Sequence, residues 1–210
     1  MQEASQRVYK NSIQALTTDR ERFITLLHDS SQPGSDASKA FINKAFYLHY
    51  NARISDYMPN LVSVIDKTKK VKAVVGYRCA GQNELFLEQH LDQPLDYYIS
   101  NYIGDEVSRS QIVEVGNLAC SANGYARLII IRLTELLFQS GYRWVGFTAT
   151  PGLLNSFQRL NLTPHSIAPA EIKKLHGTQS DWGTYYDNDP YVMFGSIEWG
   201  FNKLKEEQYI

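Results

Sequence analysis

The stretch Ser121-Ala122-Asn123-Gly124-Tyr125-Ala126 decides how this sequence folds and what it can bind. It separates an apolar, strand-like run at residues 111–119 from a strongly apolar, helix-like run at residues 127–140. A turn of small residues that ends a strand and opens a helix exposes backbone N–H groups at the positive end of the helix dipole, where phosphate groups bind. The sequence therefore predicts a site for the diphosphate of a carrier molecule. A plain helix-entry turn at Gly124 is the alternative.

Strand-like and helix-like runs alternate on both sides of this turn. Before it, a helix from Asp36 should fade ahead of Pro59, and a cap at Asp92 opens a helix that ends near Gly104. This order, with a β-hairpin in the first half and strand–helix alternation in the second, predicts an α/β domain with a mixed sheet. The expected strands lie at residues 22–28, 61–65, 71–79, 111–119, 144–149 and 191–197, and the later helices at 127–140 and 151–160.

The composition of the chain argues against several classes of function. The 210 residues carry 21 basic and 22 acidic side chains, for a net charge of -1, which gives no reason to expect general binding to nucleic acid or anionic lipid. A lysine cluster at the hairpin turn predicts a solvated turn, with a groove for an anionic partner as the alternative. We find no signal peptide and no transmembrane run. The clustered residues are Lys67, Lys69, Lys70 and Lys72.

Cysteine and histidine usage indicates neither a disulfide framework nor a metal site. Two cysteines make no disulfide framework in a chain of this length, so we expect a reducing, cytoplasmic location. Cys120 lies beside the glycine turn, where a helix N-terminus would lower the pKa of its thiol, but no histidine lies at a spacing that suggests a nucleophile. The five histidines have no metal-ligand spacing, so we predict no metal.

Glu114 is the best candidate for a catalytic base. It is the only charged residue in the sequence between residues 112 and 119, and Val113 and Val115 flank it. Partial burial among these side chains would raise the pKa of the carboxyl toward neutrality, where a general base is most useful. The alternative is that strand alternation turns Glu114 toward solvent or into an ion pair.

The glycine turn and its placement resemble the Gln/Arg-x-x-Gly-x-Gly/Ala signature of GNAT acyltransferases. Gly124 and Ala126 match, whereas Ser121 replaces the leading Gln or Arg. After the next strand, Thr150 stands where these enzymes often carry Asn. Phe157 replaces the tyrosine that often protonates the leaving thiolate in that superfamily.

The wider pattern resembles the bacterial thermostable hemolysin family. The resemblance rests on residues 45–54, 58–61, 80–92, 112–119 and 182–186, and it extends over nearly the whole chain. It implies a GNAT-like fold: a mixed, largely antiparallel central sheet splayed at its middle, with helices on both faces. We expect one domain, residues 1–210, with peripheral termini at 1–20 and 199–210.

The arrangement is also similar to acyl-homoserine-lactone synthases, in which a Glu of the same strand sits at the reaction centre. The resemblance makes Glu114 and Asn117 the candidate catalytic residues. Those synthases carry an arginine shortly after the Glu, and this chain has Asn117, so lactone synthesis itself is not implied.

The resemblance implies N-acyl transfer from acyl-CoA or an acyl carrier protein to a small amine. A backbone N–H near Leu118 or Ala119 would stabilise the oxyanion, the backbone from Ala122 to Ala126 would hold the diphosphate, and Tyr125 would pack on the pantetheine. The candidate residues for binding the acceptor are Arg53, Asp56, Tyr57 and Trp182. The alternative is that the aromatic side chains of this region form a half-buried core with polar tips.

Two other functions remain open. The family name implies a membrane-active toxin that lyses erythrocytes directly, although lysis through an acylated product would fit the predicted fold as well. The third hypothesis is an acyl-CoA-binding protein without turnover, because Ser121 and Phe157 depart from the acyltransferase pattern.

Overall fold

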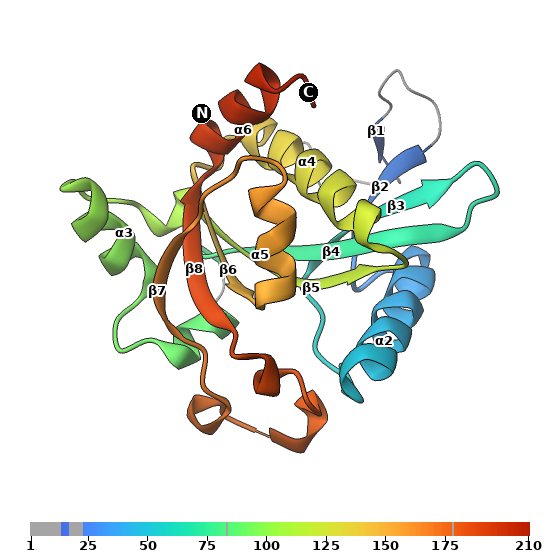
Figure 1. Cartoon of the computed structure of the whole chain (residues 1–210), viewed down its shortest axis with the longest axis horizontal. Coiled ribbons are helices and arrows are strands. Elements are labelled where there is room, and N and C mark those ends of the chain that lie inside the picture. Colours follow the sequence, from blue (N-terminus) through green and yellow to red (C-terminus); the bar gives the residue numbers. More distant parts are fainter. Residues whose placement is uncertain (1–13, 17–22, 83, 178) are drawn as a thin grey trace.

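The computed structural model describes residues 14–16, 23–82, 84–177 and 179–210. An eight-stranded sheet with the order β1-β2-β3-β4-β5-β6-β8-β7 runs through these residues (Figure 1). Neighbouring strands are antiparallel except β5 and β6, which are parallel. The strands are β1 (Gln14–Leu16), β2 (Phe23–Asp29), β3 (Asn60–Asp66), β4 (Val71–Cys79), β5 (Ile112–Cys120), β6 (Trp144–Ala149), β7 (His165–Pro169) and β8 (Tyr191–Ser196).

Five α-helices and several short 3-10 helices flank the sheet in the described residues. The α-helices are α2 (Asp36–Tyr50), α3 (Leu95–Ile103), α4 (Asn123–Gln139), α5 (Pro151–Gln158) and α6 (Ile197–Glu206). The 3-10 helices are η2 (Pro33–Ser35), η3 (Phe86–His90), η4 (Arg109–Gln111), η5 (Ile172–Lys174), η6 (Gln179–Trp182) and η7 (Tyr186–Asn188).

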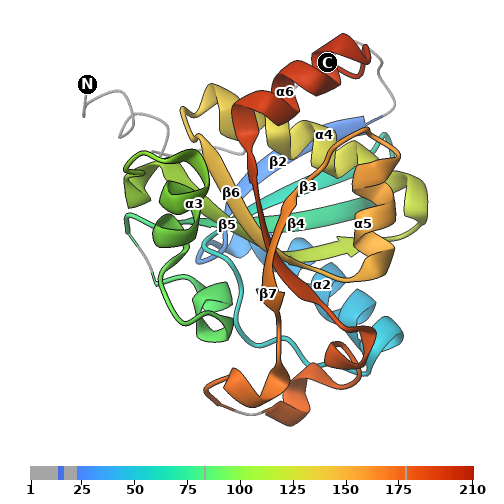
Figure 2. The ribbon, with the colours of Figure 1, turned by 60° about the vertical axis from the view of Figure 1, so that its left-hand side comes forward.

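The helices form a layer on each face of the sheet. On one face, called here the η3 face, α2 packs on β3, β4 and the end of β5, and η3 and α3 pack on the start of β5. On the other face, called the α4 face, α4 packs on β3, β4 and β5 and contacts α5 and α6. Figures 1 and 2 show α4 and α5 together on one side and α2 on the other. The predicted mixed, largely antiparallel sheet with helices on both faces is therefore confirmed.

The sheet splays where its parallel pair ends. β5 and β6 are in register only from Ile112 opposite Trp144 to Val115 opposite Phe147. Beyond that point β5 continues along β4 to Cys120, while β6 continues along β8 to Ala149. A bulge in β5, with Asn117 in the left-handed conformation at φ 52°, accompanies the separation. The predicted splay in the middle of the sheet lies here.

Several element boundaries differ from those predicted. The helix after the glycine turn begins at Asn123, so the residues from Gly124 to Ala126 lie in its first turn instead of in a loop before it. Asp36 is the first residue of α2 and caps nothing, and Pro94 instead of Asp92 occupies the N-cap of α3. Arg22, where the first strand was expected to start, lies outside the described residues.

Two elements were not predicted, β7 and α6. Strand β7 is short, lies at the sheet edge and is flanked by Pro164 and Pro169, so it carries little of a strand's usual pattern. Helix α6 lies in the segment expected to be a peripheral terminus, yet Leu204 is fully buried and Phe201 stacks on Phe138 of α4 with ring centroids 4.0 Å apart. The expected peripheral segment at residues 1–20 lies outside the described residues apart from β1.

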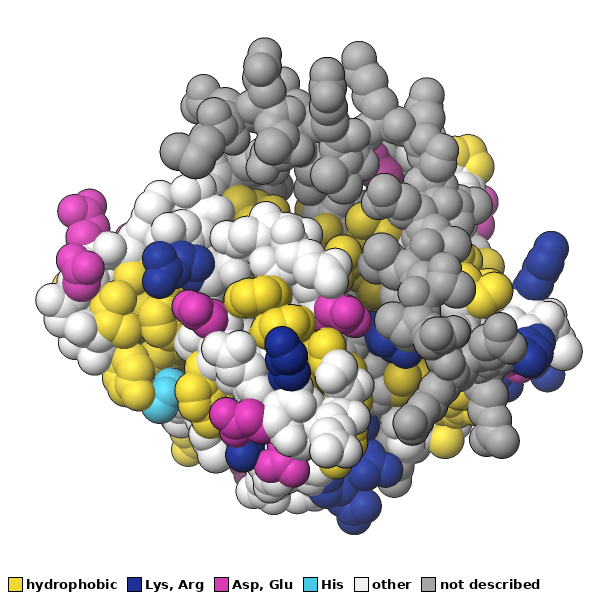
Figure 3. All heavy atoms as spheres, turned by 90° about the horizontal axis from the view of Figure 1, so that it is seen from above, with side chains coloured by type: hydrophobic (Ala, Val, Ile, Leu, Met, Phe, Trp, Pro, Cys, Tyr) yellow, Lys and Arg dark blue, Asp and Glu magenta, His cyan; other side chains and the backbone are white. Residues whose placement is uncertain are grey.

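The charge pattern agrees with the balanced composition. On the face seen from above, acidic and basic side chains are interspersed over the described residues (Figure 3). At the hairpin turn between β3 and β4, Asp66 pairs with Lys72 at 3.0 Å and accepts hydrogen bonds from Thr68 and Lys70. These bonds hold the pKa of Asp66 well below its usual range and fix the turn.

Candidate active site

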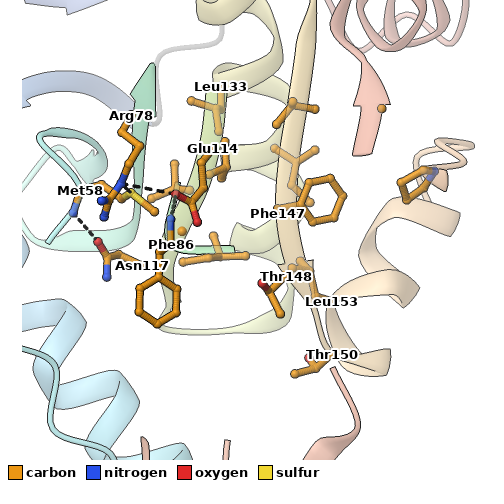
Figure 4. A pocket seen from close by; sticks show the side chains of 18 of the residues that line it. Met58, Arg78, Phe86, Glu114, Asn117, Leu133, Phe147, Thr148, Thr150 and Leu153 are labelled. Atoms are coloured by element: carbon orange, nitrogen blue, oxygen red, sulfur yellow. Dashed lines mark hydrogen bonds and ion pairs between the residues drawn. The ribbon is translucent and has the colours of Figure 1, made fainter. Parts of the chain in front are cut away.

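A cavity of about 680 Å³ opens where β5 and β6 separate. Its lining comes from both faces of the sheet. Glu114, Arg78 and Phe86 line it on the η3 face, and Leu133, Phe147 and Leu153 line it on the α4 face (Figure 4). The gap between the two strands therefore joins two half-sites that a continuous sheet would keep apart. The volume lies within the range of small-molecule sites.

Glu114 lies at the centre of this gap. Its side chain is only 3% exposed. The backbone N–H groups of Phe86 and Leu87 donate to its two carboxylate oxygens at 2.8 Å each, and Arg78 Nε lies 3.4 Å from Oε2. The first turn of η3 and the neighbouring strand β4 thus fix the carboxyl from two sides. The prediction that Glu114 is partly desolvated is confirmed; of the alternative, the solvent-facing side chain is wrong, whereas an ion pair is present, with Arg78.

Burial raises the pKa of Glu114 to about 7, although Arg78 and the two N–H donors oppose the rise. A carboxyl with this pKa exists in both protonation states near neutral pH. It can therefore accept a proton from a bound group without being fully protonated beforehand, as a general base requires.

Arg78 was not predicted, yet it is the nearest cation to Glu114. It lies directly opposite Glu114 in the register of β4 and β5. Its guanidinium also approaches Asp56 Oδ2 at 3.6 Å, and its Nε contacts Met58 Sδ at 2.9 Å. The Asp56 side chain is 75% exposed, so this second pair lies at the mouth of the cavity. The available sequence signal was an arginine in the β-rich run that directly precedes the strand of Glu114.

Asn117 lines the cavity, but its side chain serves the backbone. Its Oδ1 accepts a hydrogen bond from the N–H of Met58 at 2.8 Å, and its Nδ2 donates to the carbonyl of Asp56 at 3.4 Å. Asn is among the residues that tolerate its left-handed backbone. The structure therefore gives Asn117 a positioning function at the bulge, and a catalytic role stays a prediction.

The residues predicted to bind the donor separate into two groups. Leu118 lines the cavity at the bulge, where neither Asn117 nor Leu118 has a register partner on β4. Ala119 is paired with Val74, is buried against the α2 layer and does not line the cavity. Of the two candidates for the oxyanion donor, Leu118 is the one at the cavity, and the role stays a prediction.

The glycine turn is open to solvent and does not line the cavity. Ser121, Ala122 and Gly124 are exposed, and a side chain at Gly124 would meet no atom within 4 Å. The N–H of Ser121 donates to the carbonyl of Lys72, and that of Tyr125 donates to the carbonyl of Ala122. The N–H groups of residues 122–124, at the start of α4, are those a bound anion could still engage.

Tyr125 and Ala126 are half-buried within the first turn of α4. The Tyr125 ring packs edge-on against Phe23 of β2, with centroids 5.5 Å apart. This packing contradicts the expectation that Tyr125 lies on the pantetheine, because its ring belongs to the core beneath α4.

The candidate acceptor residues are only partly brought together. Arg53, Asp56 and Trp182 line the cavity. Tyr57 does not line it: its hydroxyl donates to the carbonyl of Ile54, and Lys39 lies 5.4 Å from its ring centroid. The N–H of Arg53 donates to the carbonyl of Asp181, which ties the end of α2 to η6.

An aromatic cluster surrounds the outer part of the cavity on the η3 face. Trp182 lies 5.3 Å from Phe86 and 5.6 Å from Tyr185, and Tyr185 lies 5.2 Å from Tyr50, all between ring centroids. Tyr186 adds its hydroxyl, 3.1 Å from Nε2 of the buried His90. Residues from three separate segments form this wall, and the sequence analysis had named only Trp182 among them as a candidate site residue.

Two of the residues that depart from the GNAT pattern follow β6: Thr150 lies directly after it and Phe157 lies in α5. Thr150 lines the cavity and shares a hydrogen bond with the hydroxyl of Tyr50, whose pKa burial raises. Phe157 stacks on Phe147, with centroids 5.0 Å apart and planes within 9°. The phenol that protonates the thiolate in many GNAT enzymes is thus replaced by a packed apolar ring.

The Cys120 thiol is half-buried at the end of β5. The expectation that a helix N-terminus lowers its pKa is wrong, because burial raises that pKa to about 12. No group of three or more His, Cys, Asp or Glu side chains could hold a metal ion among the described residues. In the same part of the chain, no helix is long and apolar enough to cross a bilayer.

Comparison with solved structures places this geometry among acyltransferase folds. FeeM, an N-acyl amino acid synthase from uncultured soil microbes, aligns with a TM-score of 0.60 at 9% identity over 95% of this chain and all of its own. BjaI, a CoA-dependent acyl-homoserine lactone synthase, aligns at 0.54 and 9% identity, over 86% of this chain and 87% of its own. A ribosomal-protein-S5-alanine acetyltransferase from Vibrio fischeri aligns at 0.53 and 12% identity, over 88% and 97%.

These likenesses confirm the predicted GNAT-like fold. No curated protein matches the sequence. The model of one family, described as thermostable hemolysin, matches residues 28–201, which is most of the sequence. The chain therefore belongs to the thermostable hemolysin family.

Proposed function

We propose that this protein is an N-acyltransferase that moves an acyl group from a thioester donor to a small amine. The observation that carries the proposal is the buried carboxyl of Glu114 at the gap between β5 and β6, where the cavity joins the two faces of the sheet. The fold shared with an N-acyl amino acid synthase and a CoA-dependent acyl-homoserine lactone synthase supports it.

In the proposed reaction Glu114 takes a proton from the ammonium group of the acceptor. The free amine nitrogen then attacks the thioester carbon to form a tetrahedral intermediate, and the C–S bond breaks when this intermediate collapses to the amide. The attacking nitrogen loses its second proton in this step, and the departing thiolate takes that proton up to become a thiol. Arg78 does not react: it holds Glu114 in place and, with the N–H groups of Phe86 and Leu87, lets the carboxylate form in a buried site.

The tetrahedral intermediate carries a negative oxygen that needs a hydrogen-bond donor. In this proposal the N–H at Leu118 supplies it, because Leu118 lies at the bulge, where it has no register partner on β4. The donor is acyl-CoA or an acyl carrier protein, and the diphosphate of the one or the single phosphate of the other would lie at the exposed N–H groups of residues 122–124. The acceptor would enter from the η3 face, past Arg53, Asp56 and Trp182.

The test is turnover of acyl-CoAs of graded chain length with a panel of small amines, followed as release of free thiol. We expect the rate to rise with pH and to level off above about pH 7, the pKa of Glu114. Glu114→Gln should bind the donor and lose turnover, on the order of 100-fold or more. The matched control is Glu106→Gln, because Glu106 is exposed and outside the cavity.

Other outcomes separate the alternatives. Normal turnover by Glu114→Gln would overturn the proposal. Donor binding without turnover for any amine would favour an acyl-CoA-binding protein, as the replacement of the usual phenol by Phe157 permits. Prompt lysis of red cells by the purified protein without an acyl donor would favour a directly membrane-active protein.

A further inference from the structure

The part of the cavity on the α4 face is walled by apolar side chains. Helix α4 contributes five lining residues, of which Thr134 is the polar one, and its hydroxyl donates to the carbonyl of Ile130 at 2.9 Å. The hydroxyl proton is therefore used within α4, and this helix offers a polar ligand no free hydrogen-bond donor in its lining side chains. The other apolar lining residues on this face include Val145, Phe147, Leu153, Phe157, Leu162 and Ile197.

A cavity of this kind suits a hydrocarbon chain. Protein interiors are close-packed, and an apolar space that no side chain fills loses dispersion contacts around its whole wall. An acetyl group would fill little of a cavity of about 680 Å³. A medium or long acyl chain would restore those contacts and remove its own apolar surface from water.

Gly200 of α6 lies in the wall of this space. It is buried, and a Cβ placed on it would lie 3.7 Å from Thr134 Cγ2 and 3.8 Å from Leu162 Cδ2, which are ordinary contact distances. Its backbone has no positive φ, so the conformation does not require glycine. Glycine inside a helix is less favourable than alanine by about 1 kcal/mol. Neither backbone geometry nor crowding therefore accounts for a glycine at this position, whereas the open cavity does.

We infer that the protein uses medium- or long-chain acyl donors and that Gly200 sets the length of the chain by leaving the space between Thr134 and Leu162 open. This inference rests on the proposed function for the identity of the ligand. It goes beyond it by naming the class of acyl group and the residue of α6 that limits it.

The experiment compares Gly200→Ala and Gly200→Leu with the unmodified protein. The alanine methyl group meets its neighbours at contact distance and leaves most of the space, while the leucine side chain extends into it. Both substitutions favour the helix, so folding is not expected to suffer. The matched control is Asn202→Leu, which adds the same apolar side chain to an exposed position of α6 outside the cavity.

Affinity is measured by calorimetry for acetyl-, butyryl-, octanoyl-, dodecanoyl- and palmitoyl-CoA, with no acceptor present. Each buried methylene should strengthen binding about fourfold until the space is full. Gly200→Leu should reach its plateau about three or four methylenes earlier and bind the longest fitting chain on the order of 100-fold more weakly. Gly200→Ala and Asn202→Leu should keep the length profile of the unmodified protein.

Each outcome decides one question. A shifted profile in Gly200→Leu alone supports the inference, even if no amine is found that gives turnover. An unchanged profile in Gly200→Leu, with tight binding of long chains, overturns the inference and leaves the proposed function standing. Binding that does not increase from acetyl to palmitoyl overturns the long-chain assignment. If no acyl-CoA binds at any length, the inference fails, and acyl-CoA is excluded as the donor in the proposed function.

Discussion

The raised pKa of Glu114 makes a quantitative prediction about stability. The group has an ordinary value of 4.5 and a value of about 7 in the folded protein, chiefly because burial disfavours the charged form. Between these two values the unfolded chain has released its proton while the folded protein still holds it. The folded state therefore loses stability as pH rises from about 4.5 to about 7, and its contribution is constant outside that window.

The size of the effect follows from the same two values. One pKa unit corresponds to about 1.4 kcal/mol, so the full window is worth about 3 kcal/mol. Between about pH 5 and pH 8 the unmodified protein should lose between about 2 and 3 kcal/mol of unfolding free energy relative to Glu114→Gln. Glutamine at position 114 cannot ionise. Its amide NH2 group would face one of the two backbone N–H donors, which lowers the unfolding free energy of the variant by about 1–3 kcal/mol at every pH.

The assay is urea unfolding of both proteins at a series of pH values, with the difference in unfolding free energy plotted against pH. Every other titrating group is common to both proteins and cancels in the difference, including His28 and His90, whose pKa values burial lowers. If the difference in unfolding free energy did not change with pH, Arg78 and the two N–H donors would fully offset the effect of burial on the pKa of Glu114. A difference of opposite slope would show that the pKa of Glu114 is lowered, which would remove the physical basis for a base active near neutral pH.

Two further predictions concern β5. Asn117→Val should destabilise the protein by about 2 kcal/mol and reduce turnover, because a β-branched residue disfavours the left-handed backbone and the bond to the N–H of Met58 is lost; Asn117→Gly should recover the backbone part of that cost in urea unfolding. If Asn117→Val and Asn117→Gly were equally stable, that result would contradict the argument from backbone strain at residue 117. Cys120 should react slowly with iodoacetamide at pH 8 in the folded protein and at an ordinary rate in urea, because burial raises its pKa to about 12; fast labelling of the native protein at Cys120, located by peptide mapping, would refute this.

Local sequence patterns predicted the helices and strands whose formation depends mainly on residues of the same segment. The strand at residues 144–149 and the hairpin at 61–65 and 71–79 follow from β-branched and aromatic runs bounded by turn residues. Strand β7 and helix α6 depend on partners distant in sequence. His165 and Ser166 form a strand because β8 offers them an edge, and α6 is held by Leu204 and by the stack of Phe201 on Phe138. Strand β7 therefore carries no clear alternation of its own, whereas α6 is amphipathic, with Ile197, Gly200 and Leu204 buried, and this periodicity was present in the sequence.

The candidate site was predictable to the same extent. Glu114 could be found because it is a single charge in an apolar strand, and the splay was implied by the family resemblance. Arg78 and Phe86 were not found, because their importance comes from the strand register and from the folding of η3 against the cavity. The glycine turn was located correctly but misjudged in detail, because α4 begins within it and Tyr125 turns into the core.

The bulge at Asn117 explains how one strand serves both half-sites. In a regular strand residues 114 and 119 would face opposite sides of the sheet, because side chains alternate. Here Glu114 faces η3 and Ala119 faces α2, on the same side, while Val115 and Leu118 pack in the core beneath α4. One residue in the left-handed conformation therefore reverses the alternation. The strand can then leave β6 and open the gap, yet it keeps an apolar side toward each helix layer. A buried carboxyl at the gap and an apolar cavity behind it are both consequences of this single change of phase.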